Sequence, residues 1–486
     1  MNTVSIAHLR RQLARYEVSF TELLQDHARR IAHRNPELNA LPTLCLDRAF
    51  DEARQLDKIL ARSTKTRSPR AVGSLAGMPY CAKDMFDTEG VRTTLGSPLY
   101  AENIPRKDAE IVRRIRSAGA VLVGKSNTPE FAAGSQTFNT VFGATRNPWD
   151  TSRTCGGSTG GGAVALATGM VCVADGSDLA ASLRNPASFC GVTGLRPSSH
   201  LEPRLQSGAN PFNTLSMVGP MGRSVDDTRE LFLAIFDPEG CAPVRGLEDW
   251  VDVRASQARR RAQVRRKRPT RIGWCPDWGG LPVERAVGGA MQRCADQLRA
   301  EGIELVDGFP ELPDVRSAFL TLRGEYFVAE FSALYAQHKT ALKDTVVWNI
   351  EQGLALNAQQ ITDAQRVRGI AHAQLTDYMN AHGLDALAGP TNQVLPFDLT
   401  TPYITEINGQ ALDTYIDWLA SNFMITVAGL PAVSIPAGFA APAPNAPTLP
   451  VGLQLVGRWG QDLALLNTAE AIESAVAPLN HSRRLP

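Results

Sequence analysis

The sequence lacks several features that mark common classes of protein. Its eight cysteines include no C-x-x-C pair, which argues against a zinc ribbon or a dithiol redox site and favours reduced thiols. The N-terminal residues contain no apolar segment of the kind found in secretory signals. The longest apolar run, residues 163–174, is too short to cross a membrane. The sequence therefore predicts a cytoplasmic protein that does not associate with membranes.

The chain also lacks a strong charge of either sign. Its formal net charge is +1, and charged residues make up 20% of the sequence beside 43% hydrophobic residues. This balance is ordinary for a globular enzyme and gives no general attraction to nucleic acid or anionic lipid. A basic run at residues 259–271 contains no interleaved aromatic residue, so we interpret it as a solvated loop. We expect no nucleic-acid partner.

The pattern of residues along the chain favours one large α/β domain over residues 1–486. Residues 1–70 form a helical part, which includes a capping box from Ser19 to Glu22. Residues 73–235 alternate between short β-like runs and helical segments, which is typical of a layered α/β core. Residues 380–475 supply further strands and a helix of the same domain. A long helix is expected between Thr362 and His382.

Two short motifs fit well-known catalytic patterns but fail in their context. GAVLVGKS, residues 119–126, matches the phosphate-binding pattern G-x-x-x-x-G-K-[ST]. A phosphate loop needs a strand before its first glycine, whereas here a helix precedes Gly119 and AVLV is itself strand-like. We therefore expect no nucleotide, and an ordinary helix-to-strand connection that leads into Lys125.

The second motif is GGSTG, residues 156–160, which matches the nucleophile-elbow pattern G-x-S-x-G. An elbow serine needs an acid and a histidine farther along the chain, and no downstream histidine stands in a recognisable catalytic setting. The surrounding run CGGSTGGG has five glycines in eight residues. So many glycines indicate that the backbone approaches another segment closely, or adopts positive φ, at several successive positions.

Several blocks of the sequence, taken together and in order, resemble the amidase signature family, which includes fatty acid amide hydrolase, bacterial acylamidases and the A subunit of the tRNA amidotransferases. The resemblance covers most of the chain. It implies a central mixed β-sheet flanked by α-helices. The blocks that carry it are GMPYCAKD (77–84), GKSNTPEFAAGS (124–135), NPWDTSRTCGGSTGG (147–161), GSDLAASLRNPASFCGVTGLRP (176–197), GLPAVSIPAG (429–438) and LPVGLQLVG (449–457).

The resemblance implies a catalytic role for three of these residues. Ser182 is expected to be the nucleophile that becomes acylated, Ser158 a bridging hydroxyl on a cis peptide bond after Gly157, and Lys83 the terminal base. Lys83 can accept a proton near pH 7 only if burial lowers its pKa from about 10.4. Its apolar flanking residues suit such burial.

Further roles follow from the same resemblance. The backbone N–H groups of Leu179, Ala180, Ala181 and Ser182 are expected to form the oxyanion hole. Family members usually have Gly-Gly where this chain has Ala180-Ala181, and alanine resists positive φ by roughly 1 kcal/mol. The departure therefore puts substrate fit in doubt more than reaction type.

Supporting and substrate-binding roles fall on residues around this centre. Asp178 and Arg184 keep the family pattern and are expected to pair and brace the loop, with a surface ion pair as the alternative. The candidates for substrate binding are Gly134, Ser135 and Thr159, the last standing where a serine is usual.

These inferences predict a hydrolase that cleaves C–N bonds of small amides, anilides or carbamates through an acyl-enzyme on Ser182. Such an enzyme would use no cofactor and no metal, and it would act on a small molecule as a monomer or homodimer. The alternatives are an amidotransferase A-type subunit that works with partner chains, or a non-catalytic binding relative. No convincing glutamine-recognition block stands between residues 279 and 392, whereas Lys83, Ser158 and Ser182 are all present.

Overall fold

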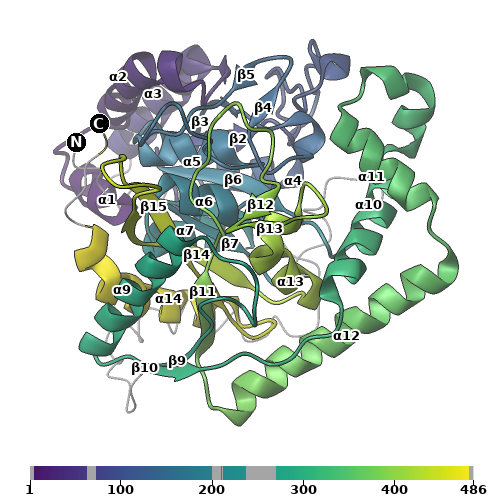
Figure 1. The fold of residues 1–486 in the computed structure, drawn as a ribbon. Helices are drawn as coiled ribbons and strands as arrows, with labels where there is room; N and C mark the ends of the chain where they lie inside the picture. Colours follow the sequence, from purple (N-terminus) through teal and green to yellow (C-terminus); the bar gives the residue numbers. More distant parts are fainter. Residues whose placement is uncertain are drawn as a thin grey trace.

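The computed structural model describes residues 5–62, 73–199, 210, 212–236, 270–480 and 485. In these ranges the chain forms one large α/β domain around an 11-stranded mixed sheet (Figure 1). The strand order is β1-β3-β2-β6-β8-β7-β14-β15-β11-β9-β10. The strands of this sheet are β1 (Thr43–Leu44), β2 (Pro79–Lys83), β3 (Val121–Ser126), β6 (Val173–Asp178), β7 (Thr193–Arg196), β8 (Met217–Gly222), β9 (Arg271–Trp274), β10 (Glu304–Asp307), β11 (Ala386–Pro390), β14 (Ala432–Ala440) and β15 (Leu449–Val456).

Parallel and antiparallel pairs alternate in blocks across the sheet. β2 lies between β3 and β6 and runs parallel to both, whereas β6 and β8 are antiparallel. β14 and β15 form a long antiparallel pair. Two short hairpins lie outside the sheet and pair β4 (Phe138–Asn139) with β5 (Gly143–Ala144) and β12 (Glu406–Ile407) with β13 (Gln410–Ala411).

Helices surround the sheet, and one group of them stands apart as a lobe (Figure 1). The lobe consists of α10 (Val315–His338), α11 (Asp344–Leu354) and α12 (Ala358–Ala381). α11 and α12 each pack on α10, and α10 and α12 also pack on α13 (Ala420–Ala428). The remaining α-helices of the described ranges are α1 (Ile6–Ala14), α2 (Phe20–Leu38), α3 (Leu46–Arg62), α4 (Glu110–Ser117), α5 (Gly160–Ala167), α6 (Arg184–Cys190), α7 (Val225–Ile235), α9 (Arg285–Ala300) and α14 (Asp462–Asn480). Short 3-10 turns are η2 (Pro98–Tyr100), η3 (Glu130–Ala132), η6 (Lys339–Ala341) and η7 (Asp417–Leu419).

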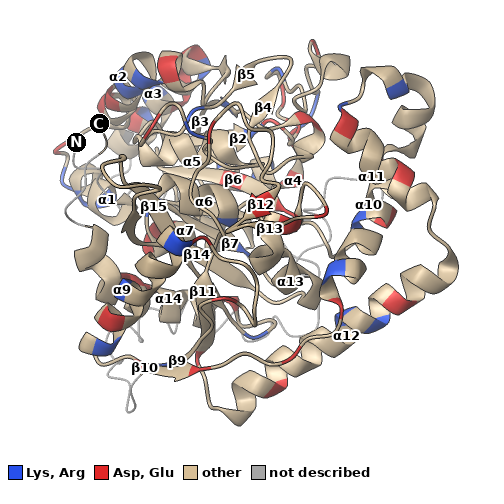
Figure 2. Ribbon diagram, in the orientation of Figure 1, with Lys and Arg blue, Asp and Glu red and all other residues tan. Residues whose placement is uncertain are grey.

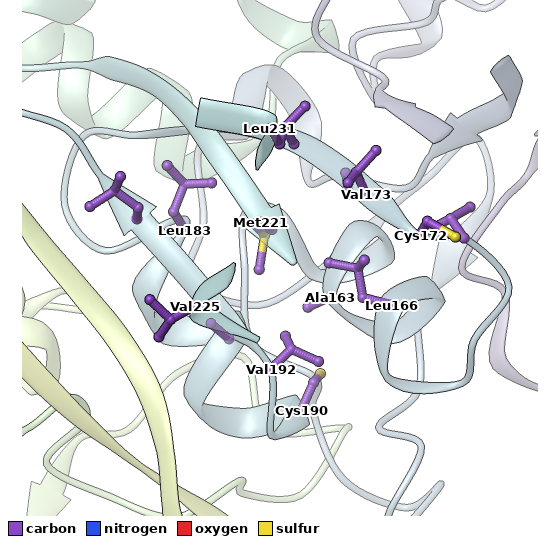
Figure 3. Close-up of a cluster of buried hydrophobic side chains, with 14 of the residues drawn as sticks. Ala163, Leu166, Cys172, Val173, Leu183, Cys190, Val192, Met221, Val225 and Leu231 are labelled. Atoms are coloured by element: carbon purple, nitrogen blue, oxygen red, sulfur yellow. The ribbon is translucent and has the colours of Figure 1, made fainter. Parts of the chain in front are cut away.

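The core consists of apolar side chains between the sheet and its covering helices. Figure 3 shows part of it, where Ala163 and Leu166 from α5 and Leu231 from α7 lie beside Val173 from β6 and Met221 from β8. Acidic and basic residues are instead interspersed along outer helices such as α2, α9 and α12 (Figure 2). No helix in the described ranges combines the length and the apolar character needed to span a membrane.

The capping residues in the sequence predicted the ends of the helices only in part. The capping box of Ser19 and Glu22 is present at the start of α2. The long helix begins at Ala358, four residues before the expected start, because Asn357 and Gln360 form a capping box there. Gly383 follows this helix with a φ of 59°. The basic run at 259–271 lies almost entirely outside the described residues.

The phosphate-loop motif is a buried strand. Residues 121–126 form β3, and α4 ends at Ser117 before Gly119, whose φ is 91°. Lys125 is fully buried, and its Nζ donates to the Thr88 hydroxyl and the Phe86 carbonyl. The strand is followed by Pro129, which is the N-cap residue of the short turn η3.

Candidate active site

The candidate site begins at the carboxyl end of β2, where Lys83 is the last strand residue. Its Nζ lies 2.7 Å from Ser158 Oγ, 3.1 Å from Thr159 Oγ1 and 3.1 Å from Ser177 Oγ. The Lys83 side chain is completely buried. Burial lowers the pKa of Lys83 to about 7, although the charges of Asp175 and Asp178 oppose this shift. A neutral amine is therefore available near neutral pH to accept a proton from a hydroxyl group.

Asp175 stabilises the base of this site from the neighbouring strand β6. Its carboxylate accepts hydrogen bonds from the backbone N–H of Lys83, at 2.6 Å, and from the hydroxyl of Tyr80. Burial raises the pKa of Asp175 to about 6, in spite of these hydrogen bonds and the charges of Lys125 and Lys83. Above that pH Asp175 holds the end of β2 in place through its ionised carboxylate.

Ser158 lies in the glycine-rich segment before α5. The peptide bond between Gly157 and Ser158 is cis, as the family resemblance implies. The glycines are needed because other segments approach this backbone closely. A Cβ at Gly160 would lie 2.3 Å from Thr137 Oγ1, and one at Gly161 would lie 2.3 Å from the backbone N of Asn127. Larger residues would therefore push Ser158 away from Lys83.

Ser182 lies in the turn between β6 and α6. The turn is held by Arg184, whose Nε and Nη2 donate to the two oxygens of Asp178 at 3.0 and 2.9 Å. Both side chains are completely buried, so this pair is not a surface ion pair. Burial would raise the pKa of Asp178, but the charge and hydrogen bonds of Arg184 lower it below its usual value. Asp178 also accepts from the Leu183 N–H at 3.1 Å, which closes the turn.

Two carbonyl groups of this turn accept hydrogen bonds from buried arginines. Arg196 donates to the Asp178 carbonyl, and Arg184 donates to the Ala180 carbonyl at 2.9 Å. In a trans peptide the next N–H points away from the carbonyl. No acceptor is present among the described residues for the N–H groups of Leu179, Ala180, Ala181 and Ser182. Neither alanine has a positive φ, so the strain expected at these positions does not arise.

A cavity of about 340 Å³ opens on this turn. Ser158, Ser177 and Ser182 line it together with the predicted residues Gly134 and Ser135. Thr159 does not line it, because its hydroxyl is turned toward Lys83. Of the predicted oxyanion residues, Leu179, Ala180 and Ser182 contribute to the lining. Aromatic side chains form much of the remaining wall: Phe86, Tyr100, Phe131, Tyr326, Phe327 and Phe331.

The structure adds residues that the sequence motifs did not single out. Ser177 contacts Lys83 and faces the cavity, although it stands inside the quoted block GSDLAAS. Asn185 donates to the carbonyls of Ser135 and Gly157, at 2.9 and 3.0 Å, and so joins two walls of the site. Asn185 is a polar residue three positions after the proposed nucleophile, which was a signal in the sequence. The residues that it contacts are distant in the sequence, so its role could not be predicted.

Comparison with known proteins establishes the family. The amidase family model matches residues 22–466, and the chain belongs to this family. It is similar to the A subunit of the glutamyl-tRNA(Gln) amidotransferase of Anaeromyxobacter dehalogenans (strain 2CP-C), with 33% identity over 95% of this chain and 94% of the relative. The corresponding protein of the same name from Azoarcus sp. (strain BH72) is 34% identical over 98% of both chains.

Solved structures support the same fold. A bacterial aryl acylamidase of the amidase signature family superposes with a TM-score of 0.82 at 24% identity, over 99% of both chains. A second structure, described as an amidase, has a TM-score of 0.79 at 26% identity and covers 97% of this chain and 100% of its own. The chain therefore has the amidase signature fold, and amide hydrolysis is the chemistry of its class.

These relatives correct two expectations drawn from the sequence. The prediction of a stand-alone hydrolase of small amides, anilides or carbamates is wrong, because the similar curated proteins are subunits of an amidotransferase. The prediction of a monomer or homodimer without a nucleic-acid partner is wrong for the same reason, since the relatives are named as one subunit of an enzyme acting on glutamyl-tRNA(Gln). The alternative of an A-type subunit is the better interpretation.

Proposed function

We propose that this chain is the amide-cleaving subunit of an amidotransferase, which releases ammonia from an amide donor for use by partner chains. The observation that carries the chemistry is the buried contact of 2.7 Å between Lys83 Nζ and Ser158 Oγ, beside the turn that holds Ser182. The full-length similarity to the A subunits of amidotransferases supports the subunit role. A cytoplasmic location is consistent with this role.

In the first half of the reaction Ser182 is the nucleophile. Its Oγ attacks the carbonyl carbon of the donor amide, and its proton passes to Ser158 while the Ser158 proton passes to Lys83. Lys83 can accept this proton because burial holds its pKa at about 7. The C–O bond forms as the carbonyl oxygen takes the negative charge.

The negative oxygen is stabilised by the free N–H groups of residues 179–182. Because they are held by fixed contacts of Arg184 and Arg196 before the substrate binds, they need no reorganisation as charge develops. The intermediate then collapses, the C–N bond breaks, and the proton on Lys83 returns through Ser158 to the leaving nitrogen. Ammonia departs and a water molecule hydrolyses the acyl group on Ser182.

The released ammonia has an acceptor outside this chain. From the name of its relatives, we take the acceptor to be a glutamyl-tRNA(Gln). This division of labour assigns acyl-enzyme chemistry to the present chain and tRNA binding to the assembled enzyme.

The test is complementation in a bacterium whose own copy of this type of chain can be depleted. The chain is expressed together with the partner subunits from its own source, and growth and Gln-tRNA(Gln) formation are measured. We expect rescue by the wild-type chain and none by Ser182→Ala, which lacks the nucleophile but keeps the turn. An Arg366→Met variant, altered on the exposed side of α12, serves as the matched control and should rescue.

A second measurement uses the purified complex and L-glutamine. We expect ammonia release that depends on Ser182, and an acyl adduct on the peptide containing Ser182 when turnover is quenched. Failure to rescue growth by a well-expressed chain, combined with hydrolysis of amides without any transfer to tRNA, would contradict the subunit role. An adduct on Ser158 would instead contradict the assignment of the nucleophile.

A further inference from the structure

Two of the three hydroxyl groups around Lys83 make the same contact but differ in what lies beside them. Thr159 Oγ1 and Ser177 Oγ each lie 3.1 Å from Lys83 Nζ. Thr159 is completely buried and does not line the cavity, whereas Ser177 is half-buried and lines it. Ser177 therefore contacts both the base and the space in which an amide would bind.

The strand β6 separates these two hydroxyl groups. Successive side chains of a strand point to opposite faces, so a side chain at Gly176 would face away from that of Ser177. A Cβ at Gly176 would lie 2.6 Å from Thr159 Oγ1, which places Thr159 on the face away from Ser177. In the ladder Ser177 pairs with Val218, another residue that lines the cavity. The two hydroxyl groups therefore approach Lys83 from different sides, and Ser177 approaches it from the cavity.

The donors and acceptors of a neutral amine assign a direction to each of its hydrogen bonds. Neutral Lys83 has two N–H groups and one lone pair. In the proton relay the lone pair receives the proton of Ser158, whose Oγ lies nearest at 2.7 Å, so the two N–H groups donate to Thr159 and Ser177. Within the part of the chain that the structure describes, the Ser177 hydroxyl has no other hydrogen bond. Its own proton is therefore available to an acceptor in the cavity.

We propose that Ser177 is a second proton donor to the leaving nitrogen, in parallel with Ser158. This inference rests on the proposed function, in which an amide is cleaved in the cavity. As the C–N bond breaks, the electron pair on nitrogen takes the hydroxyl proton of Ser177, and Ser177 Oγ takes a proton from the Lys83 ammonium. Lys83 returns to the neutral amine, while Ser158 keeps the proton that came from Ser182.

The hydrogen-bonding duties of Ser158 give a reason for a second donor. During the attack Ser158 accepts the proton of Ser182 and gives its own to Lys83, so its hydroxyl is directed at these two groups and not at the nitrogen. Ser177 takes no part in the attack. Once Lys83 is an ammonium, its hydrogen bond to Ser177 becomes charge-assisted, which strengthens the Ser177 hydroxyl as a donor. Donation from Ser177 is therefore favoured when the nitrogen has to leave.

The test compares two substrates that have the same acyl group and different leaving groups. The nitrogen of L-glutamine needs a proton in order to leave, whereas the phenolate of a γ-nitrophenyl ester of L-glutamate leaves as an anion. In the purified complex we expect Ser177→Ala to lower kcat/KM for glutamine about 10- to 100-fold, at most the lower end of the usual contribution of general acid catalysis because Ser158 remains. The value for the ester should stay nearly unchanged. The ratio between the substrates is the readout, because a merely structural role would lower both rates.

Thr159→Val is the matched control, because it removes a hydroxyl at the same distance from Lys83 on the side away from the cavity. Its loss of rate should be the same for glutamine and the ester. Ser177→Thr keeps the hydroxyl and should retain most of the glutamine rate. Ser177→Gly removes the same hydroxyl and replaces Ser177→Ala if that variant does not fold. An equal loss for both substrates without the Ser177 hydroxyl, or no loss for either, would overturn the inference.

The same measurements separate this inference from the proposed function. If the wild-type complex cleaves glutamine but transfers no ammonia to tRNA, the subunit role fails and the ratio still decides the role of Ser177. If transfer is normal and Ser177→Ala affects both substrates alike, only the role of Ser177 fails. If the wild-type complex does not cleave glutamine, both fail.

Discussion

The carboxyl ends of β2 and β3 offer two buried lysines in adjacent positions with different surroundings. The strands are parallel, and their register places Lys83 opposite Ser126 and Ala82 opposite Lys125. Both lysines are completely buried, and burial lowers the pKa of each. Burial alone therefore does not decide which of the two lysines can act as a base.

The difference lies in the atoms around each amine. Lys125 donates to the Phe86 carbonyl, which can only accept a hydrogen bond, and the charge of Asp84 favours its protonated form. Lys83 instead contacts three hydroxyl groups, from Ser158, Thr159 and Ser177. A hydroxyl can donate or accept, so this environment suits both the neutral amine and the ammonium. We infer that Lys83 exchanges protons whereas Lys125 serves structure.

The largest expected effect is a difference in activity between variants of the two lysines. Lys83→Met should lower kcat by about 100- to 10,000-fold, the usual contribution of general acid–base catalysis, because no other group can take the proton from Ser158. Lys125→Met should keep most of the activity but lower the free energy of unfolding by about 1–3 kcal/mol, since the Phe86 carbonyl and Thr88 hydroxyl lose their donor. Ammonia release and denaturant unfolding measure the two effects.

The stability of Lys83→Met serves as the control for this comparison. The folded-state pKa of Lys83, about 7, lies below the ordinary value of 10.5, so folding requires release of a proton at any pH between these values. Methionine does not carry this cost. The variant should therefore unfold no more easily than the wild type near pH 8, and an unfolded Lys83→Met protein beside an active, stable Lys125→Met protein would fit only a structural role for Lys83.

A second effect concerns pH. Because the pKa of Lys83 is lowered to about 7, its neutral form increases as the pH rises through that value. We expect kcat/KM for an amide to rise with an apparent pKa near 7 and to stay high at alkaline pH, with the titration belonging to the coupled hydroxyl and amine groups. Lys83→Arg should be nearly inactive throughout, since a guanidinium keeps its proton. A profile controlled by a pKa near 10 would contradict the comparison.

The same contrast explains how much of this site the sequence could predict. Lys83, Ser158 and Ser182 each stand in a block whose local pattern is distinctive, and the structure brings Lys83 and Ser158 together beside the turn of Ser182. The α/β architecture followed from the alternation of segments. Thr159, however, was expected to bind substrate, because a motif does not show to which side a hydroxyl turns.

Local sequence patterns could not predict the cavity wall or the proposed partner chains. Arg323, which lines the cavity from α10, meets Asn349 and Tyr415 through contacts that span 26 and 92 residues of sequence, and its helix reads as an ordinary amphipathic segment. A surface that contacts partner subunits carries no fixed motif either, so the absence of a glutamine-recognition block was weak evidence against a role in a larger enzyme. The full-length similarity to known subunits corrected the prediction of a stand-alone enzyme, because a comparison over the whole chain includes the residues of all such surfaces.

A smaller effect is expected at Asp175, whose negative charge raises the pKa of Lys83. Asp175→Asn removes that charge but can still accept the hydrogen bond from the Lys83 N–H. The pKa of Lys83 should fall further, so the acid limb of the kcat/KM profile should move to lower pH. The plateau activity should change little. A shift to higher pH would show that Asp175 acts mainly by holding β2 and not through its charge.

The smallest expected effect comes from Thr159, whose hydroxyl is one of the three around Lys83. Thr159→Val keeps the shape of the side chain and removes only the contact of 3.1 Å to Lys83 Nζ. Because a single neutral hydrogen bond contributes about 0.5–1.5 kcal/mol, we expect roughly a 2- to 10-fold loss in kcat. Thr159→Ser restores the hydroxyl and should recover most of the activity. A large increase in the KM of Thr159→Val with unchanged kcat would instead support the substrate-binding role that the sequence predicts. The hydroxyl groups that distinguish the surroundings of Lys83 from those of Lys125 would then be those of Ser158 and Ser177.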